Sequence, residues 1–429
     1  MTLDLLPLLD PQPEVPKRHN TDLSLDGFPI NDKLRFVRKI GAGTYGLIYL
    51  VEDVETGAEF AAKMVMTDPP VKNGGRIDVD ENKKLIQRKM YEYFVCSPKN
   101  VVELDLDMVA REGVRCPFLK EIALHLRVSS HPNVVTIHKV LNLGRVAVMT
   151  LMDYYDEGDL FGNIIDRGLF LRPPPWQDQQ KLMKNCMLQL IDVVSYCAAQ
   201  SVFHCDLKPE NVMIRYNRSH RRAPGSPLVD YGELQIALID FGLAMTSNTI
   251  CCNACRGLSF YMAPERIVNF NTNHLVKSLV DMRQYPTVEN APKLGAKLFP
   301  TLAGDIWLLG VLFINITCAR NPWPIANIND VNDVFGTYIL QNRDILASIL
   351  PILHRFNRLL DEIFRLNPNE RILLADLYRK IARIDFFSDE IRKDDEDLVY
   401  NPQLSTPPPE RPLAERDFVP NCPLLIKTT

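Results

Sequence analysis

The chain contains the stretch Phe203-His204-Cys205-Asp206-Leu207-Lys208-Pro209-Glu210-Asn211, which places an aspartate, a lysine and an asparagine on one turn. The apolar run Val212-Met213-Ile214 follows it directly and has the composition of a buried strand. A carboxylate, an ammonium group and an amide so close together indicate a polar site at the start of that strand.

A second apolar run, Leu234 to Ile239, ends in Asp240-Phe241-Gly242. Two strands side by side would bring Asp206, Asn211 and Asp240 to the same end of the pair. The carboxylate of Asp240 and the amide of Asn211 can hold Mg²⁺ through oxygen, the ligand atom that magnesium prefers. Asp206 is then free to accept a proton from an incoming hydroxyl. Together these residues describe a phosphoryl-transfer site.

The two stretches resemble the catalytic loop and the metal-binding signature of eukaryotic protein kinases. Lys208 resembles the serine/threonine branch, and His204-Cys205-Asp206 resembles a fungal subgroup linked to nutrient response and control of meiosis. The resemblance covers roughly residues 34–387. It implies an α+β, two-lobed protein kinase fold, with a small antiparallel-sheet N-lobe that carries one main helix and a larger, mainly helical C-lobe.

Length and composition suit one enzyme of this kind. The 429 residues exceed one average domain and fit a two-lobed enzyme with insertions and tails, and the apolar fraction of 46% supports a sizeable core. The formal charge of −4 gives no reason to expect nucleic acid or an anionic membrane as a partner.

Cysteine usage and apolar runs bear on the compartment. The ten cysteines lack regular pairing, which indicates free thiols in a reducing compartment. Residues 1–10 lack the basic region of a signal peptide. The longest apolar stretch, Ile306–Ala319, is shorter than the roughly 20 residues of a membrane helix and predicts a buried helix. We therefore expect an intracellular protein, cytoplasmic, nuclear or both.

The composition along the chain predicts one domain with three insertions. We expect a flexible segment at 1–30, a kinase domain at 31–387 with an N-lobe at about 31–152 and a C-lobe at about 156–387, and an acidic, proline-rich tail at 388–429. The insertions are expected at 67–115, 215–232 and 269–299. Partner proteins could dock on the insertions and on the tail. The basic run 215–222 is either a solvated turn or a docking or nuclear-import signal.

The N-lobe pattern begins with a strand at Leu34–Ile40, the run Gly41-Ala42-Gly43-Thr44-Tyr45-Gly46, and a second strand at Leu47–Val51. A dinucleotide-binding fold would place a helix after such glycines, whereas here a strand follows. The pattern favours a glycine-rich hairpin over the phosphates of ATP, with a plain hairpin turn as the alternative.

The next strand, Glu59–Val65, carries a single lysine, Lys63, inside an apolar run. A solvent-facing lysine is the plain alternative to the phosphate-binding lysine that the resemblance implies. Such a lysine needs an acidic partner. We favour Glu121 over Glu103 and Glu112, because a strand-like segment follows the helix of Glu121 at the expected distance.

The buried strand at Val146–Met152 resembles the one that leads into the hinge between the lobes. The resemblance implies that backbone groups of Asp153 and Tyr155 bind the purine and that Asp159 reaches the ribose, with a solvated acidic loop as the alternative. The other nucleotide-binding residues that it implies are Ile40, Gly41, Gly43, Gly46, Ile48, Ala61, Lys63, Met152 and Met213. It implies catalytic roles for Asp206, Lys208, Lys63 and Glu121, and it assigns the metal to Asn211 and Asp240.

Several residues are expected to hold the C-lobe together. Trp176–Gln200 has the apolar spacing of one long helix, with Leu190 and Cys197 in the core. The resemblance implies that Glu265 pairs with Arg371 and that Asp305 anchors the backbone of the catalytic loop.

Cys205 departs from the family, which commonly has an arginine between the histidine and the aspartate. That arginine usually receives a phosphate on the activation segment, and a cysteine cannot form such a pair. We therefore expect activity without phosphorylation of the activation segment, although Thr246, Ser247, Thr249 and Ser259 are available. A second departure is His125, where the family more often has an aliphatic residue and where a core histidine is the alternative.

The activation segment has two further unusual features. Leu258 stands where serine/threonine kinases usually have Ser or Thr, which weakens the argument from the substrate loop. Cys251, Cys252 and Cys255 are close enough to bind zinc or to form a redox switch, but no fourth ligand is nearby, so reduced cysteines are the favoured interpretation.

The sequence thus predicts an ATP- and Mg²⁺-dependent serine/threonine kinase acting on hydroxyl groups of protein substrates, in intracellular signalling. The alternative is a pseudokinase scaffold that binds nucleotide and partners without turnover. A scaffold of that kind would be expected to lack Lys63, Asp206 or Asp240, and all three are present.

Overall fold

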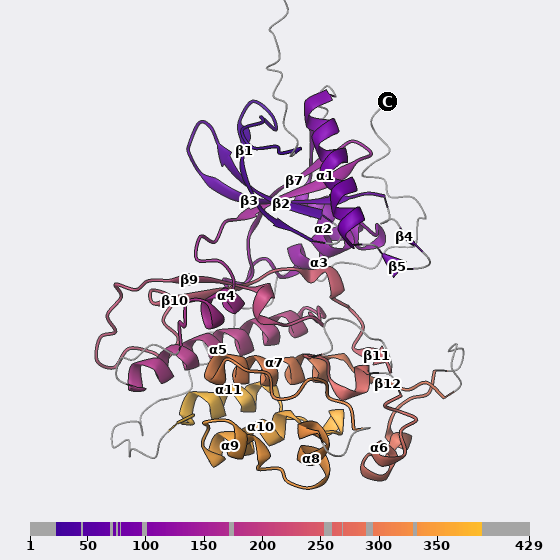
Figure 1. Cartoon of the computed structure of the whole chain (residues 1–429), viewed down its shortest axis with the longest axis vertical. Coiled ribbons are helices and arrows are strands. Elements are labelled where there is room, and N and C mark those ends of the chain that lie inside the picture. Colours follow the sequence, from indigo (N-terminus) through magenta and orange to yellow (C-terminus); the bar gives the residue numbers. More distant parts are fainter. Residues whose placement is uncertain are drawn as a thin grey trace, which may run out of the picture.

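The computed structural model describes residues 23–43, 46–68, 72–73, 76–77, 79–96, 101–170, 176–252, 260–267, 269–288, 295–328 and 333–387. In Figure 1 a smaller lobe around a β-sheet lies above a larger lobe of helices. This is the predicted two-lobed α+β arrangement. The first 22 residues and the predicted tail 388–429 lie outside the described residues.

The N-lobe is built on one antiparallel sheet of six strands in the order β1-β2-β3-β8-β7-β6. Side chains alternate along the first strand, so Leu34 and Phe36 are buried while Arg35 is exposed. The strands are β1 (Leu34–Ala42), β2 (Gly46–Asp53), β3 (Glu59–Met66), β8 (Ala147–Asp153), β7 (Ile137–Leu143) and β6 (Val101–Leu104).

The predicted insertion 67–115 is folded into the N-lobe and adds helices to the one main helix that we expected. Ile86 and Met90 of α1 are buried in the same apolar cluster as Phe36, and β6 forms the edge of the sheet. The new elements are β4 (Lys72–Asn73), β5 (Arg76–Ile77), α1 (Val79–Cys96), β6, α2 (Leu106–Glu112) and η1 (Gly113–Arg115), and they precede the expected helix α3 (Lys120–Val128).

Residues 23–30 fall within the predicted flexible segment, but they pack against the sheet. Leu25 and Ile30 are fully buried in the N-lobe core. Gly27 has φ +79°, a left-handed conformation that favours glycine, and its N–H donates to Phe36 O over 2.8 Å. Residues 23–30 are therefore packed as part of the folded N-lobe.

The C-lobe is a layer of helices around one large apolar cluster. Its two longest helices, α5 and α7, contact each other, and α11 packs on α5. The helices are α4 (Leu160–Ile165), α5 (Trp176–Ala199), α6 (His274–Leu279), α7 (Thr301–Cys318), α8 (Val334–Leu340), α9 (Ile345–Ile349), α10 (His354–Ile363) and α11 (Leu374–Arg383).

The structure confirms both long helices that were predicted for the C-lobe. Leu190 and Cys197 on α5 are buried, and burial raises the pKa of the Cys197 thiol. Helix α7 begins five residues before the predicted start at Ile306. Among the described helices, α7 alone is long and apolar enough to cross a membrane, but 89% of it is buried inside the protein, as expected of a core helix.

Two further pairs of antiparallel strands lie in the C-lobe. Strands β9 (Val212–Tyr216) and β10 (Leu234–Leu238) are antiparallel and enclose the predicted basic insertion 215–232. Strands β11 (Thr249–Cys251) and β12 (Leu298–Pro300) pair the activation segment with the end of the predicted insertion 269–299. The short 3₁₀ turns between these elements are η2 (Pro209–Asn211), η3 (Phe241–Leu243), η4 (Pro264–Arg266), η5 (Met282–Gln284) and η6 (Pro368–Glu370).

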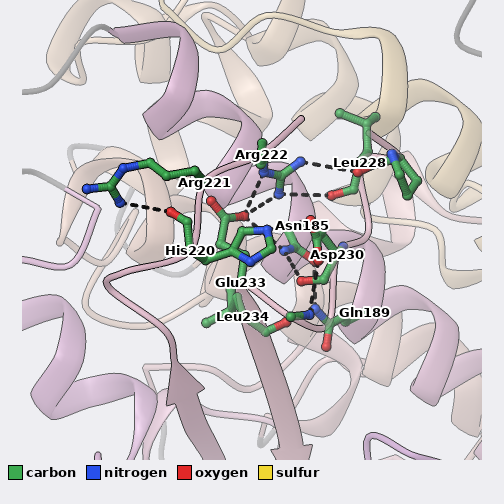
Figure 2. Close-up of polar contacts among 11 residues, drawn as sticks. Asn185, Gln189, His220, Arg221, Arg222, Leu228, Asp230, Glu233 and Leu234 are labelled. Atoms are coloured by element: carbon green, nitrogen blue, oxygen red, sulfur yellow. Dashed lines mark hydrogen bonds and ion pairs between the residues drawn. The ribbon is translucent and has the colours of Figure 1, made fainter. Parts of the chain in front are cut away.

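The basic insertion between β9 and β10 is tied to the C-lobe, as Figure 2 shows. The Arg222 guanidinium is paired with Glu233, and His220 Nε2 lies 2.9 Å from Asp230 Oδ2. Asn185 on α5 donates to Asp230 O over 3.0 Å. Part of the basic run therefore has a structural use instead of forming a free basic turn.

Candidate active site

The catalytic loop is held by its backbone between the β9–β10 pair and α7. Asp305 on α7 accepts hydrogen bonds from the N–H groups of His204 and Cys205, each over 2.9 Å. Cys205 has φ +64°, so the turn here is tight. The expected anchoring role of Asp305 is therefore present in the structure. Burial acts to raise the pKa of Asp305 and exceeds the opposing effect of Arg266.

Asp206 lies at the centre of the loop with two polar neighbours. Lys208 Nζ is 2.8 Å from Asp206 Oδ2. Asn211 Nδ2 donates to the Asp206 carbonyl over 2.8 Å and contacts Asp206 Oδ2 at 3.2 Å. Because the amide nitrogen of Asn211 faces Asp206, its oxygen is directed elsewhere and can serve as a metal ligand. The loop thus brings these three residues together, as the sequence predicted.

Asp240 follows β10 and is joined to the catalytic loop through the residue before it. Ile239 N donates to Asn211 O over 3.0 Å, so the two candidate metal ligands are on adjoining segments. Asp240 has φ +62° and ψ 72°, a left-handed conformation that is costly for a non-glycine residue and that often marks a functional site. Its Oδ1 accepts from Gly242 N over 3.4 Å.

Lys63 forms two ion pairs, one within the N-lobe and one that reaches the C-lobe. Its Nζ lies 2.5 Å from Glu121 Oε1 and 3.3 Å from Asp240 Oδ1. Burial acts to lower the pKa of Lys63, but these two carboxylates outweigh it, and the pKa is raised. Burial likewise acts to raise the pKa of Asp240, but Lys63 and His204 outweigh it, and this pKa is lowered. Both groups are charged at neutral pH.

Glu121 is the partner of Lys63 that the sequence favoured, and the rejected candidates lie elsewhere. Glu103 on β6 pairs with Lys139 on β7 at 3.1 Å. Glu112 ends α2. Helix α3 therefore carries the acidic residue to the site. The strand-like segment that follows this helix joins the N-lobe sheet only from Ile137 onward. Val134, earlier in that segment, forms a bridge with Leu238 of the C-lobe instead.

The three glycines of the β1–β2 hairpin are under different constraints. A Cβ on Gly46 would meet Met64 O at 2.0 Å, so only glycine fits where β2 runs beside β3. A Cβ on Gly43 would meet nothing within 4 Å, and one on Gly41 would make ordinary contact with Ile48 at 3.4 Å. Gly46 is thus required by the sheet itself, whereas Gly43 faces open space.

The residues expected around the purine form a partly exposed apolar surface where the lobes meet. Met152 lies opposite Ala61 across the β3–β8 pair, and Met152 and Met213 pack together beside the buried Tyr155. The five apolar side chains are all half-buried: Ile40, Ile48, Ala61, Met152 and Met213. An apolar surface left half open is suited to bind a flat, apolar ring.

The hinge residues are held by local bonds. Asp153 N donates to Thr136 O over 3.1 Å, so this N–H is already bonded within the protein. Gly158 N donates to Tyr155 O over 3.1 Å, and the Arg215 guanidinium lies over the Tyr155 ring. Asp159 caps α4 by accepting from Gly162 N over 2.8 Å, a structural use that the sequence did not predict.

His125 is a buried histidine that stacks behind the site. Its ring lies 4.9 Å from that of Phe241, which in turn lies 5.0 Å from His204. His125 Nε2 is 2.6 Å from Val135 O, so the neutral ring can donate to this carbonyl. Burial lowers the pKa of His125 to about 4. The residue therefore fills the aliphatic position of the family as a neutral core histidine.

The predicted tie between Glu265 and Arg371 is present and fully buried. Two parallel bonds of 2.7 Å join the guanidinium to the carboxylate. Arg371 also donates to Ala303 O over 2.8 Å and lies over the Trp307 ring. The tie joins η4, α7 and the chain before α11.

Arg266 is a buried residue that the sequence analysis missed. It directly follows Glu265, and its guanidinium contacts Cys205 O, Thr301 O and Asp305. An arginine at this place in the sequence gives no sign of burial, because all three partners are distant in the chain.

The structure describes only some of the residues for which predictions were made on the activation segment. Leu258, Ser259 and Cys255 lie outside the described residues. Cys252 Sγ accepts from Lys297 N over 3.3 Å. Among the residues that the structure describes, no three His, Cys, Asp or Glu side chains are arranged to hold a metal ion. The candidate magnesium pair differs from such a cluster, because one of its two ligands is an asparagine.

Comparison with known proteins gives a consistent result. The protein kinase domain family matches residues 106–284. The chain is 34% identical over 362 residues to serine/threonine-protein kinase VHS1 of Saccharomyces cerevisiae, an alignment that covers 82% of this chain and 70% of that protein. It is 33% identical to serine/threonine-protein kinase SKS1 of the same yeast, covering 84% and 66%.

A third relative comes from fission yeast. The chain is 32% identical to the protein named negative regulator of sexual conjugation and meiosis in Schizosaccharomyces pombe, covering 84% of this chain and 62% of that protein. The chain thus matches about two thirds of the length of these three relatives.

Proposed function

The chain belongs to the protein kinase family, and from that premise we propose that it transfers the terminal phosphoryl group of ATP to serine or threonine hydroxyls of proteins. The observation that carries the proposal is the position of Lys63, whose ammonium group lies between Glu121 of the N-lobe and Asp240 of the C-lobe. This contact supports the proposal because it sets the candidate phosphate-binding cation beside a candidate metal ligand, whose neighbour Ile239 donates to Asn211 O of the catalytic loop.

The residues present fit ATP and magnesium. The Asp240 carboxylate and the Asn211 amide oxygen supply two oxygen ligands. The left-handed backbone of Asp240 is unfavourable in conformational free energy, and binding of a cation by its carboxylate would offset this. When bound, Mg²⁺ neutralises the charge that develops on the phosphate oxygens. Lys63 would hold the inner phosphates, and Gly43 would let the hairpin approach them.

The chain's own groups account for the proton and for the orientation of the acceptor. Asp206 orients the substrate hydroxyl and accepts its proton. Lys208, at 2.8 Å from this carboxylate, is placed to steady the transferring group. Catalysis of this kind relies on positioning and on stabilisation of charge, not on a covalent intermediate.

The test is transfer from labelled ATP with Mg²⁺ to a generic protein substrate. The parent chain is compared with Asp206→Asn and Asp240→Asn, and with Asp281→Asn, a change at an exposed ion pair, as the matched control. We expect transfer by the parent and the control and a loss of roughly 100-fold or more in the two site variants. Acid hydrolysis of the product identifies the modified residue.

Three results would count against the proposal. Equal transfer by parent and Asp206→Asn would exclude Asp206 as the base. No transfer by the parent, with nucleotide binding retained in a thermal-shift assay, would favour the scaffold alternative. Phosphotyrosine as the main product would assign the enzyme to a different branch.

A further inference from the structure

Residues 247–252 of the activation segment are bound by residues that precede and begin α7. Thr301, the first residue of α7, donates through its N–H to Asn248 O over 2.9 Å and through Oγ1 to Ser247 O over 2.7 Å. Beyond these two carbonyls, β11 pairs with β12, and Cys252 N donates to Lys297 O over 2.8 Å. The carbonyls of Ser247 and Asn248 are therefore both bound by Thr301.

Thr301 is joined in turn to the catalytic loop through a buried cation. Arg266 Nη2 donates to Thr301 O over 3.0 Å, and Nη1 donates to Cys205 O over 3.3 Å. The guanidinium is 1% exposed, and its charge is balanced by Asp305 at 3.7 Å. These contacts form a continuous path from the loop backbone to the activation segment.

The space for this guanidinium is built into the fold. A Cβ on Gly304 would meet Arg266 Nη2 at 2.2 Å, so the absence of a side chain there admits the arginine. Asp305, the next residue, binds the two N–H groups of the loop, while Arg266 binds a carbonyl of the same turn. The loop is thus held through both kinds of backbone group.

We propose that Arg266 and Thr301 are positioning residues that hold the activation segment against the catalytic loop, so that the segment is ordered without a phosphate group. Cys205 has no charge with which to bind a phosphate, and the path Cys205–Arg266–Thr301–Ser247 connects the same two segments by uncharged carbonyls and one buried cation. The inference deepens the proposed kinase function and rests on it where activity is concerned.

The insertion before α7 supports the strand that carries this contact. Phe299 on β12 is fully buried, and its ring lies 4.5 Å from Tyr285 and 5.4 Å from Phe270. Lys297 Nζ donates to Tyr285 O over 2.9 Å. The proposal therefore gives a use to the residues of 269–299 that the structure describes: they fix β12 as a partner for β11.

The decisive experiment changes one hydroxyl. Thr301→Val keeps the shape of the side chain and removes the bond to Ser247 O, whereas Thr301→Ser keeps the donor. Thr317→Val is the matched control, because Thr317 is buried on the same helix and its hydroxyl donates to Phe313 O within that helix over 2.7 Å. All proteins are treated with phosphatase before assay, and two quantities are measured: hydrogen exchange of peptides covering 245–252, and kcat and KM for a peptide substrate.

We expect Thr301→Val to increase exchange in 245–252 and to lower kcat by roughly 3- to 10-fold, the effect of one hydrogen bond, with little change in KM for ATP. Thr301→Ser should restore both, and Thr317→Val should change neither. The proposal is overturned if Thr301→Val behaves like Thr317→Val, or if phosphatase treatment abolishes the activity of the parent.

The exchange measurement also separates this proposal from the proposed function. If the parent transfers no phosphate either with or without phosphatase treatment, but Thr301→Val still increases exchange in 245–252, the ordering role stands and the kinase function fails. If the parent is active and exchange is unchanged in Thr301→Val, the kinase function stands and the ordering role fails. Arg266→Met should increase exchange more than Thr301→Val does, but it also leaves Asp305 buried without its cation. The comparison of Thr301→Val with Thr317→Val is therefore the one that tests the proposal.

Discussion

At the scale of single residues, His125 shows how burial changes the chemistry of a side chain. The ring is enclosed by Phe241 and the backbone of Val135, and Lys63 and His204 both oppose its protonation. Burial dominates and lowers the pKa to about 4 from an ordinary value of about 6.5, although the hydrogen bond to Val135 O and the charge of Asp240 both favour protonation.

This shift predicts a loss of stability in mild acid. Between pH 6.5 and 4 the unfolded chain binds a proton at His125 that the folded chain does not, so the free energy of unfolding falls as the pH is lowered through this window. From pH 7 to pH 5 the contribution is about 2 kcal/mol. His125→Leu should remove this part of the pH dependence, as measured by urea unfolding at several pH values.

The control is His354→Gln, because His354 is 74% exposed at its side chain. It should retain the pH profile of the parent. An unchanged profile in His125→Leu would mean that His125 is protonated in the folded protein or that other groups dominate between pH 7 and pH 5.

At the scale of elements, two glycines of the β1–β2 hairpin differ in how closely the sheet constrains them. A methyl group on Gly46 would overlap with Met64 O at 2.0 Å, whereas one on Gly43 would meet nothing within 4 Å. We expect Gly46→Ala to lower stability by about 1–3 kcal/mol or more, because β2 must move away from β3. Gly43→Ala should change stability by less than about 0.5 kcal/mol.

Thermal unfolding and ATP kinetics distinguish the two roles. Gly43→Ala should keep the Tm of the parent and raise KM for ATP if the hairpin approaches the phosphates there. If Gly46→Ala kept the Tm of the parent, the close contact with β3 would be relieved at no cost, and the structural role of Gly46 would be refuted.

The basic insertion offers a second matched pair. The Arg222 guanidinium binds Glu233 and the carbonyls of Pro227 and Leu228. Among the described residues, the exposed Arg221 donates to the carbonyls of Arg218 and His220, and Figure 2 shows the bond to His220. We expect Arg222→Ala to increase hydrogen exchange across residues 217–233 and to cost about 1–3 kcal/mol, because Glu233 loses its cation. Arg221→Ala should leave exchange unchanged. Equal exchange in both variants would show that the pair does not hold the loop.

The elements also show what local pattern can and cannot predict. Strand alternation and helical spacing are local, so β1, β2, β3, α5 and most of α7 could be predicted from the sequence. Gly304 and Asp305 interrupt the apolar run on its N-terminal side, and the start of α7 was therefore placed too late. The packing of Leu25 and Ile30 depends on contacts with β1 and α1, which no short segment can reveal.

The candidate site was predictable for a related reason. Asp206, Lys208 and Asn211 are close in sequence, and the pairing of two apolar runs is enough to bring Asp240 beside them. The burial of Arg266 was not predictable, since its three partners come from three distant segments. The left-handed backbone of Asp240 likewise has no sequence signal, because glycine is the residue expected at such a position.

At the scale of the whole molecule, the stability of the C-lobe depends on a buried ion pair near its centre. Glu265 and Arg371 are each 1% exposed at the side chain, and the guanidinium also binds Ala303 O and Arg365 O. A buried pair of this kind contributes little net stability compared with apolar residues of the same size, but removing one partner leaves the other as an uncompensated charge.

We therefore predict that Glu265→Gln costs about 3–5 kcal/mol in the unfolding of the C-lobe, whereas Asp281→Asn, at a pair whose arginine is 91% exposed, changes it by less than about 0.5 kcal/mol. Trp307 and Trp323 are both buried in the C-lobe, so tryptophan fluorescence in urea reports the unfolding of that lobe. The double variant Glu265→Gln with Arg371→Met should recover part of the loss, because no buried charge then remains. If the double variant were no more stable than Glu265→Gln, the cost would come from lost packing over Trp307 and not from the unpaired charge.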